Sequence, residues 1–406
     1  MNISLPMPPL TPPPVQTRAP IRSTLRDPRL DFFRGLAMFI ILIAHIPGNW
    51  ATLFIPARFG FSDATEIFVF CSGMASAAAF GKVFRDHGWS YGAARIAFRV
   101  WQVYWAHIGL FLAVAASMAL VNSSPFATFD YVADLNLYPF FDDTQANLVG
   151  LLTLTYVPNY FDVLPMYIVI LLMLPVVVAL SRVHPGLAFV AIITLWAMVQ
   201  AGMLKLPAEP WTDRPWFFNP FGWQLIFFTG FAFMSGWLPA PPVDRRLIVL
   251  AALILVLTVP LAHVPTLFRY ELLADWNRAI LRLIDKPDFG ILRYVHFLAI
   301  AYLAWVAVGP GGARLAPPAG DGTVARLWRG TMAVILKVGQ QSLAVFIASM
   351  FLARLLGVVL IEAGASYGTM WLVNLLGMAM IIGVAYGVAW FKSPPWNTAK
   401  ASKGAA

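Results

Sequence analysis

The chain has 406 residues, of which 60% are hydrophobic and 12% are charged, and its formal net charge is +9. A soluble globular domain carries about 25% charged residues, so this composition excludes a soluble enzyme and predicts an all-α, polytopic membrane protein. Positive charge of this kind is typical of cytoplasmic loops, so it does not indicate nucleic-acid binding. The single cysteine excludes an internal disulfide, and the sequence holds no metal-ligand spacing, nucleotide-binding loop or Gly-x-Ser-x-Gly motif.

Both ends of the chain are predicted to be tails. Residues 1–29 are rich in proline and arginine and lack the apolar core of a signal peptide, so we expect a disordered extension. Residues 392–406 are short and basic. Residues 30–391 then form the membrane domain.

That domain contains ten hydrophobic runs near the length of about 20 residues that crosses a bilayer. With both termini in the cytoplasm, the inner loops hold most of the lysines and arginines, as membrane orientation requires. The loop 122–161 carries four aspartates and no Lys or Arg, so we expect it to face outward. The predicted spans are 31–47, 61–81, 96–121, 162–181, 186–204, 220–238, 246–263, 291–309, 338–361 and 369–391.

The first span carries an ionisable pair, Arg34 and His45. Eleven residues make almost three helical turns, so both side chains lie on one face, roughly 16 Å apart at about 1.5 Å rise per residue. Ionisable groups inside a membrane are costly and usually functional. A neutral imidazole can take a proton from a hydroxyl, so His45 is the candidate general base. The alternative is a structural histidine bonded to a neighbouring helix.

Arg34 is the candidate contact for an anionic donor at the cytoplasmic side. Asp31 lies one turn earlier and can hold the guanidinium by an acid–base pair. A fixed guanidinium suits a phosphate-bearing ligand. The alternative is an arginine that extends to the inner headgroups.

The second span begins with two acidic residues, Asp63 and Glu66, on one helical face. Because this span starts at the side where His45 ends the first, either carboxylate could bond the imidazole and increase its basicity. The alternative for both is capping of the helix N-terminus.

Polar residues near the ends of later spans are further candidates. Those expected to contact an acceptor at the outer side are Asp162, Tyr167, Gln224, Arg293 and His296. Asp162 could instead cap its helix. Gln341 and Ser342 form a polar patch that could meet the donor at the cytoplasmic side.

Two outer segments are expected to have structure of their own. Residues 264–290 contain an amphipathic stretch that should lie along the membrane interface. Residues 205–219 are rich in proline and tryptophan, and their rings could anchor at the headgroups or stack on a sugar.

Several stretches together resemble the OpgC family, the succinyltransferases of osmoregulated periplasmic glucans, within the acyltransferase-3 membrane acyltransferases. The matching stretches are 29–35, 63–70, 159–167, 219–224 and 341–346. The resemblance implies ten helices, a cytoplasmic acyl-CoA donor and an acceptor on the outer side. The family's arginine and histidine correspond to Arg34 and His45.

The resulting hypothesis is O-acyl transfer, with succinyl the favoured group, onto a hydroxyl of a periplasmic glucan or another envelope glycan. Acyl-CoA is the co-substrate, no cofactor or metal is bound permanently, and the protein lies in a bacterial inner membrane. The alternative is a transporter or export protein with His45 and Glu66 as a proton relay. We find no paired halves with broken helices, which disfavours it. A purely structural subunit would leave the intramembrane charges unexplained.

Overall fold

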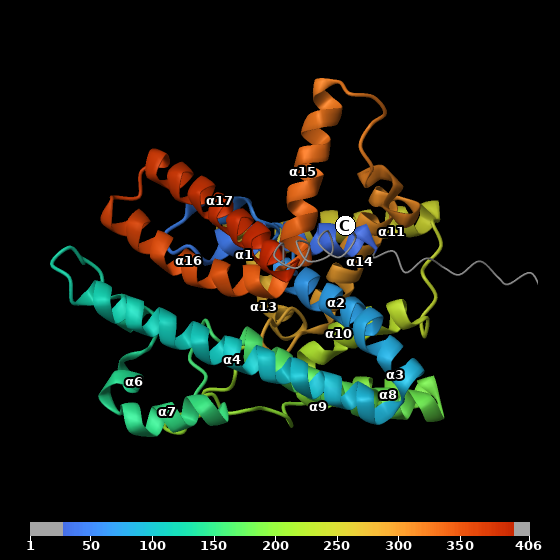
Figure 1. Ribbon diagram of the computed structural model, residues 1–406, viewed down its shortest axis with the longest axis horizontal. Helices are drawn as coiled ribbons and strands as arrows, with labels where there is room; N and C mark the ends of the chain where they lie inside the picture. Colours follow the sequence, from blue (N-terminus) through green and yellow to red (C-terminus); the bar gives the residue numbers. More distant parts are fainter. Residues whose placement is uncertain (1–26, 394–406) are drawn as a thin grey trace, which may run out of the picture.

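The computed structural model describes residues 27–393, and this part of the chain is helical apart from loops and one isolated β-bridge, Pro207–Pro215. The predicted all-α class is confirmed, and each of the ten predicted spans corresponds to a helix (Figure 1). These helices are α1 (Pro28–His45), α2 (Ala64–Ser76), α4 (Trp89–Asn122), α8 (Val163–Val183), α9 (Pro185–Gln200), α10 (Pro220–Ser235), α11 (Arg245–Ala262), α14 (Ile291–Val308), α16 (Ser342–Glu362) and α17 (Tyr367–Lys392).

Seven helical segments in the described part are long and apolar enough to cross a membrane, with α2 counted together with its continuation to His87. Helices α9 and α10 have 16 residues each, and α1 carries three charged residues. The chain is therefore a membrane protein. The count of ten spans and the cytoplasmic termini stay predictions.

The remaining helices are short or lie at the ends of the long ones. They are α3 (Lys82–His87), α5 (Tyr131–Asp134), α6 (Tyr138–Asp142), α7 (Thr144–Thr153), α12 (Val264–Arg269), α13 (Glu271–Ala279) and α15 (Thr323–Gln340). A π-helical turn, Ala77–Gly81, joins α2 to α3, and 3-10 turns cover Trp50–Phe54, Pro56–Arg58, Leu281–Leu283 and Pro310–Leu315.

Helix α1 begins earlier than expected. Asp27 caps it by accepting a hydrogen bond from the backbone N–H of Arg29 at 3.0 Å, and Pro28 occupies the first turn, where a missing N–H costs nothing. The last residues of the predicted tail 1–29 therefore belong to the helix. Most of that tail and of the predicted tail 392–406 lies outside the described residues.

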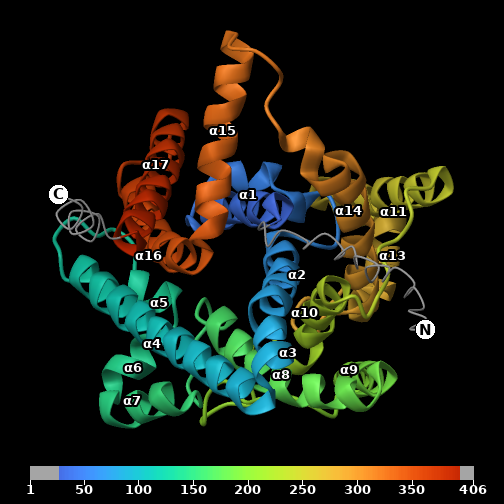
Figure 2. The same ribbon diagram turned by 45° about the vertical axis from the view of Figure 1, so that its right-hand side comes forward.

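The long helices form a bundle in which α1 packs against α2, α15 and α16, and α2 packs against α10 (Figures 1 and 2). Glycine permits the α2–α10 contact, since a Cβ on Gly73 would lie 1.9 Å from the carbonyl oxygen of Phe227. Phe68 and Val69 of α2 and Phe227 and Phe231 of α10 belong to one cluster of buried apolar side chains.

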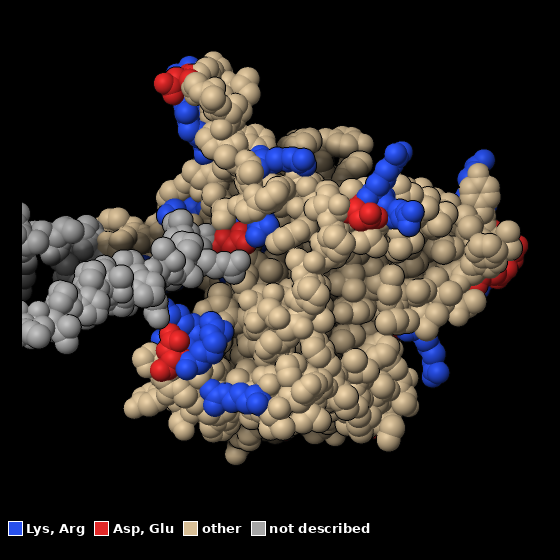
Figure 3. Space-filling view, turned by 90° about the vertical axis from the view of Figure 1, so that its right-hand side faces the viewer, with Lys and Arg blue, Asp and Glu red and all other residues tan. Residues whose placement is uncertain are grey.

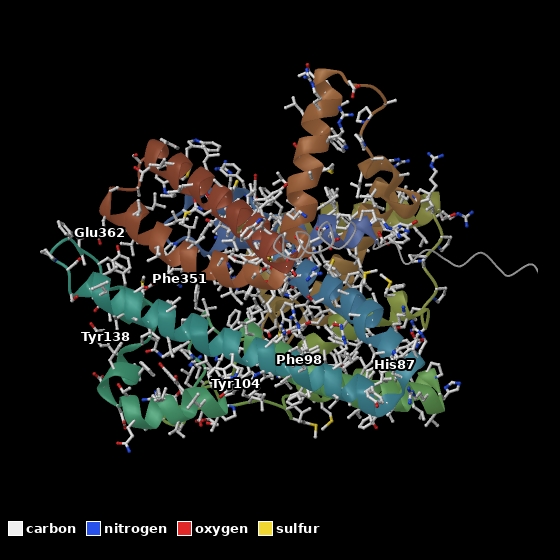
Figure 4. The ribbon with its side chains drawn as sticks, viewed as in Figure 1. His87, Phe98, Tyr104, Tyr138, Phe351 and Glu362 are labelled. Carbon is white, nitrogen blue, oxygen red and sulfur yellow. The ribbon has the colours of Figure 1, made fainter. Side chains whose placement is uncertain are left out.

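The two ends of the bundle differ. Figure 4 places Glu362 and Tyr138 at one end, and His87 at the opposite end. At the first end the loop 123–161 folds over the helix ends. Glu362 holds it there by accepting hydrogen bonds from Thr128 Oγ1 at 2.8 Å and from Tyr131 Oη at 2.7 Å.

The predicted span 338–361 is divided in the structure. Residues up to Gln340 belong to α15, the helix breaks at Gln341, and α16 starts at Ser342. Helix α15 projects away from the bundle in both ribbon views (Figures 1 and 2).

The proline- and tryptophan-rich segment 205–219 is a turn that packs on the bundle. Trp216 is buried and packs with Val157 and Ala208, so it neither anchors at headgroups nor stacks on a sugar. Trp211 is half-exposed and lies against the ring of Tyr156. The segment 264–290 contains α12 and α13, and its place at the interface stays a prediction.

Candidate functional site

His45 is the last residue of α1, and its ring is held by its own helix. Its Nδ1 lies 2.7 Å from the carbonyl oxygen of Ile41. A carbonyl can only accept a hydrogen bond, so Nδ1 carries the proton and the neutral ring has its lone pair on Nε2. Among the described residues no hydrogen bond engages Nε2. The ring is therefore in the tautomer that can accept a proton at Nε2.

Tyr160 packs beside this ring, with 5.6 Å between the two ring centroids in an edge-on arrangement. Its φ of +86° is in the left-handed region, and its hydroxyl donates a hydrogen bond to the carbonyl of Met350 in α16. A residue other than glycine keeps such a φ only where its surroundings hold it, and such positions are frequent at functional sites. Burial raises the pKa of the Tyr160 phenol, so it stays protonated.

Arg354 of α16 lies over the aromatic ring of Tyr160. Its guanidinium carbon lies 4.1 Å from the centroid of the Tyr160 ring, and its Nη1 donates a 2.6 Å hydrogen bond to Asp134 of α5. Lys286, Arg354 and Asp63 are close enough to His45 to interact electrostatically with its imidazole. The candidate base thus sits among charged groups from three segments of the chain.

Asp63 and Glu66 cap α2, as the alternative interpretation expected. Asp63 Oδ1 accepts from the backbone N–H of Thr65 at 2.7 Å, and Glu66 Oε2 accepts from the backbone N–H of Asp63 at 2.8 Å. This reciprocal capping box satisfies two N–H groups of the first turn.

The same carboxylates also form ion pairs. Asp63 Oδ2 lies 2.5 Å from Lys286 Nζ, and Glu66 Oε1, fully buried, lies 2.7 Å from Arg293 Nη1. Burial alone would raise the pKa of Asp63, but the Lys286 ammonium holds it well below its usual range. Neither carboxylate bonds to His45 among the described contacts. That expected bond is corrected, because the two nearby cations engage the carboxylates and Ile41 orients the ring.

The candidate donor residues meet where α1, α15 and α16 converge. Arg34 donates a hydrogen bond to Ser342 Oγ, and the preceding Gln341 accepts one from Lys392 Nζ at 2.7 Å. Asp31 is buried there, and a Cβ on Gly339 would lie 1.8 Å from its carbonyl oxygen. The structure therefore brings Asp31, Arg34, Gln341 and Ser342 to one end of α1.

Arg34 and His45 both lie near helix α16. Arg34 contacts Ser342 at the start of α16, and His45 lies near Arg354 of the same helix. Twelve residues of α16 span about 18 Å, which matches the separation of the two groups on α1. A cavity of about 680 Å³ runs along another face of α1, lined by Phe33, Ile40 and apolar residues of α2, α11 and α14, and neither Arg34 nor His45 lines it.

The candidate acceptor residues do not form one group. Gln224 is fully buried and its Nε2 donates to the carbonyl of Ile192 at 2.8 Å, so its partner is a helix rather than an acceptor hydroxyl. Tyr167 packs edge-on against Phe227. Of the five candidates, Arg293 pairs with Glu66, one turn from Asp63 at the start of α2.

The other two candidates are buried in structural contacts. His296 Nδ1 lies 2.7 Å from Ser62 Oγ. Asp162 accepts a hydrogen bond from the backbone N–H of Phe217 at 3.0 Å and so fixes the segment 205–219. Its side chain makes no capping bond to α8. These contacts do not support an acceptor role for either residue.

Tyr160, Arg354 and Lys286 were missed as site residues. Arg354 is a cation inside an apolar helix, the same signal that singled out Arg34. Tyr160 lies in the stretch 159–167 that carries the family resemblance. Lys286 had no signal beyond its place in a polar turn.

A comparison with protein-family models matches residues 26–393 to the family described as OpgC protein. The match covers nearly the whole chain, including every helix that positions His45 and Arg34. Searches of curated proteins and of solved structures found no match.

Proposed function

The chain belongs to the OpgC family, and on that premise we propose that it transfers an acyl group, favouring succinyl, from cytoplasmic acyl-CoA to a hydroxyl of a periplasmic glucan or another envelope glycan. Membership of this bacterial family indicates a transferase, and the apolar helices indicate a membrane protein. The proposal adds the acyl donor, the acceptor and a location in the inner membrane.

The observation that carries this proposal is the hydrogen bond from His45 Nδ1 to the Ile41 carbonyl at 2.7 Å. It leaves Nε2 able to take the proton of an acceptor hydroxyl. The hydroxyl oxygen then attacks the thioester carbonyl, the C–S bond breaks, and the proton passes from the imidazolium to the leaving thiolate. The products are an ester and free coenzyme A, and no protein nucleophile is needed.

The charges around His45 suit this reaction. The tetrahedral intermediate carries negative charge on oxygen, which nearby cations stabilise. Lys286 and Arg354 are the cations near the ring. The same groups provide attraction for the free carboxylate of a succinyl chain.

Arg34, at the end of α1 opposite to His45, is suited to bind the phosphates of the acyl-CoA donor. Arg34 with Ser342 presents a guanidinium held by a helix start, the geometry that recognises phosphate. A donor bound there would extend its arm over roughly 16 Å, the rise of eleven helical residues, to reach His45. The acceptor would enter from the outer side.

The decisive experiment supplies labelled succinyl-CoA to vesicles that contain the full-length protein and glucan. His45→Ala should lower ester formation by about 100-fold or more, the usual contribution of a general base. His107→Leu is the matched control, because His107 is also buried in a membrane helix but lies outside this site. Equal labelling by wild type and His45→Ala would refute the proposal.

The transporter alternative receives no support from the same contacts. Both oxygens of Glu66 are engaged, by Arg293 and by the N–H of Asp63, and His45 Nδ1 is bonded to Ile41. A proton relay between the two side chains would require these contacts to break. Mass analysis of envelope glycans from a deletion strain separates the two functions. Loss of ester mass supports the transferase, and unmodified glycan retained inside the cell supports transport.

A further inference from the structure

In the described part of the chain, the C-terminal half of helix α15 (Thr323–Gln340) packs on the bundle, whereas its N-terminal half contacts the segment just before it, where Trp328 Nε1 donates a 3.0 Å hydrogen bond to the carbonyl of Leu315. Near its C-terminal end it packs closely on α1, where a Cβ on Gly35 would lie 2.1 Å from the carbonyl oxygen of Ile335. Its other half extends into open space in both ribbon views (Figures 1 and 2). There Val324 is 73% and Leu327 67% exposed. The projecting half of α15 thus exposes large apolar side chains.

The sequence of α15 divides it into two stripes. At 100° per residue, Val324, Leu327, Trp328, Ile335 and Val338 fall on one face. The inner part of this apolar stripe is covered by α1, and its outer part is exposed. The apolar stripe therefore continues from the protein contact into the exposed half without a break.

The opposite face of α15 is cationic. Arg326, Arg329 and Lys337 lie there together with Ala333, and the helix contains no acidic residue. Arg329 pairs with Asp321, which precedes the helix and is 95% exposed. Figure 3 shows charged side chains gathered at the tip of this projection. An apolar stripe backed by arginine and lysine is typical of helices that lie in a membrane interface.

The position of α15 fits the cytoplasmic leaflet. It joins the bundle beside Asp31 and Arg34, at the end of α1 that the charge asymmetry assigns to the cytoplasm. The cytoplasmic leaflet is the one whose anionic lipids attract basic segments. Trp328, on the edge of the apolar stripe, is 37% exposed, and its Nε1 already donates to the carbonyl of Leu315, so Val324 and Leu327 are the residues left to enter the lipid.

We propose that the exposed half of α15 lies in the headgroup region of the inner leaflet, with Val324 and Leu327 among the acyl chains and Arg326 and Arg329 bound to the phosphates of anionic phospholipid. This interaction is separate from catalysis at His45. Because α15 is followed directly by Gln341 and Ser342, the lipid contact would also fix the helix start that meets Arg34.

The test uses the full-length protein in nanodiscs of phosphatidylcholine, with or without phosphatidylglycerol. The single Cys71 is buried and is replaced by alanine. An environment-sensitive fluorophore is then attached to Val324→Cys, on the apolar stripe, or to Ala333→Cys, the matched control on the cationic face of the same helix.

We expect the label at 324 to emit at shorter wavelength and to be quenched by nitroxide lipids, while the label at 333 is quenched by aqueous iodide. Phosphatidylglycerol should increase this contrast, and Arg326→Gln with Arg329→Gln should remove the increase. The proposal is overturned if iodide quenches both labels equally in both lipids. It is also overturned if the label at 324 is shielded only in discs that hold two copies, which would indicate self-association.

Discussion

The guanidinium of Arg354 stacks over the ring of Tyr160, with 4.1 Å from its carbon to the ring centroid. The Tyr160 ring is roughly perpendicular to the His45 ring, and the same guanidinium bonds Asp134 in the loop 123–161. One arginine thus connects the loop 123–161 to the tyrosine that packs beside the candidate base. Its planar shape matters here, because a guanidinium can lie flat on a ring while its edge N–H groups bond a carboxylate, and the compact ammonium of lysine has no such plane.

Arg354→Lys is therefore expected to lower kcat about tenfold, which corresponds to about 1.4 kcal/mol and lies within the range of a desolvated cation–π contact. Loss of the stack should misplace Tyr160 and with it the imidazole of His45. Steady-state transfer from acyl-CoA measures the effect, and Arg354→Ala should lose more activity than Arg354→Lys. A role limited to stability would lower the melting temperature and leave kcat unchanged.

The Glu66–Arg293 pair predicts a large stability effect. Glu66 is fully buried and Arg293 is 12% exposed, so Glu66→Gln leaves a buried guanidinium without its counter-charge. We expect a loss of about 3–5 kcal/mol in the free energy of unfolding.

The control for this prediction is the exposed pair of Arg278 and Asp275 on α13. Asp275→Asn should change the free energy of unfolding by less than about 1 kcal/mol. Chemical unfolding in detergent measures both variants, and a small effect of Glu66→Gln would contradict a structural role for the pair. Combining Glu66→Gln with Arg293→Met should recover part of the loss.

The buried carboxyl of Asp162 should make the stability of the protein depend on pH. Burial raises the pKa of its carboxyl to about 7, against 3.8 for an ordinary aspartate. Between these values the folded protein holds a proton that the unfolded chain has released, so the contribution of Asp162 to stability falls as pH rises from about 4 to about 7. Melting temperatures of wild type and Asp162→Asn across this range provide the measurement. The asparagine variant should lack this part of the slope, and identical slopes would contradict the assignment.

His107 in α4 is fully buried, and neither ring nitrogen has a hydrogen-bond partner among the described residues. An unsatisfied buried polar group costs about 1–3 kcal/mol. His107→Leu should therefore leave the melting temperature unchanged or raise it. His296→Leu is the contrasting variant, because it removes the bond to Ser62 and should destabilise the protein. A large loss of stability in His107→Leu would show that the ring has a partner.

Several features of the site could be predicted from the sequence because they depend on local periodicity. Helical periodicity places Arg34 and His45 on one face of α1 whatever surrounds the helix; in the structure Arg34 contacts Ser342 of α16, and His45 lies near Arg354 of the same helix. The capping of α2 by Asp63 was likewise weighed from its position alone. Arg354 could have been found by the same rule, as an ionisable residue within an apolar helix.

By itself, the sequence determined that this is a membrane protein of apolar helices with an ionisable stripe along the first, since hydropathy and helical period are properties of neighbouring residues. Only the tertiary structure decided which residues pair with the charged side chains of the site. Glu66 bonds Arg293, and Asp63 bonds Lys286, more than 200 positions away in each case. It also placed Tyr160 against His45 and turned α15 away from the bundle. Such contacts follow from how distant helices pack, which no local pattern encodes.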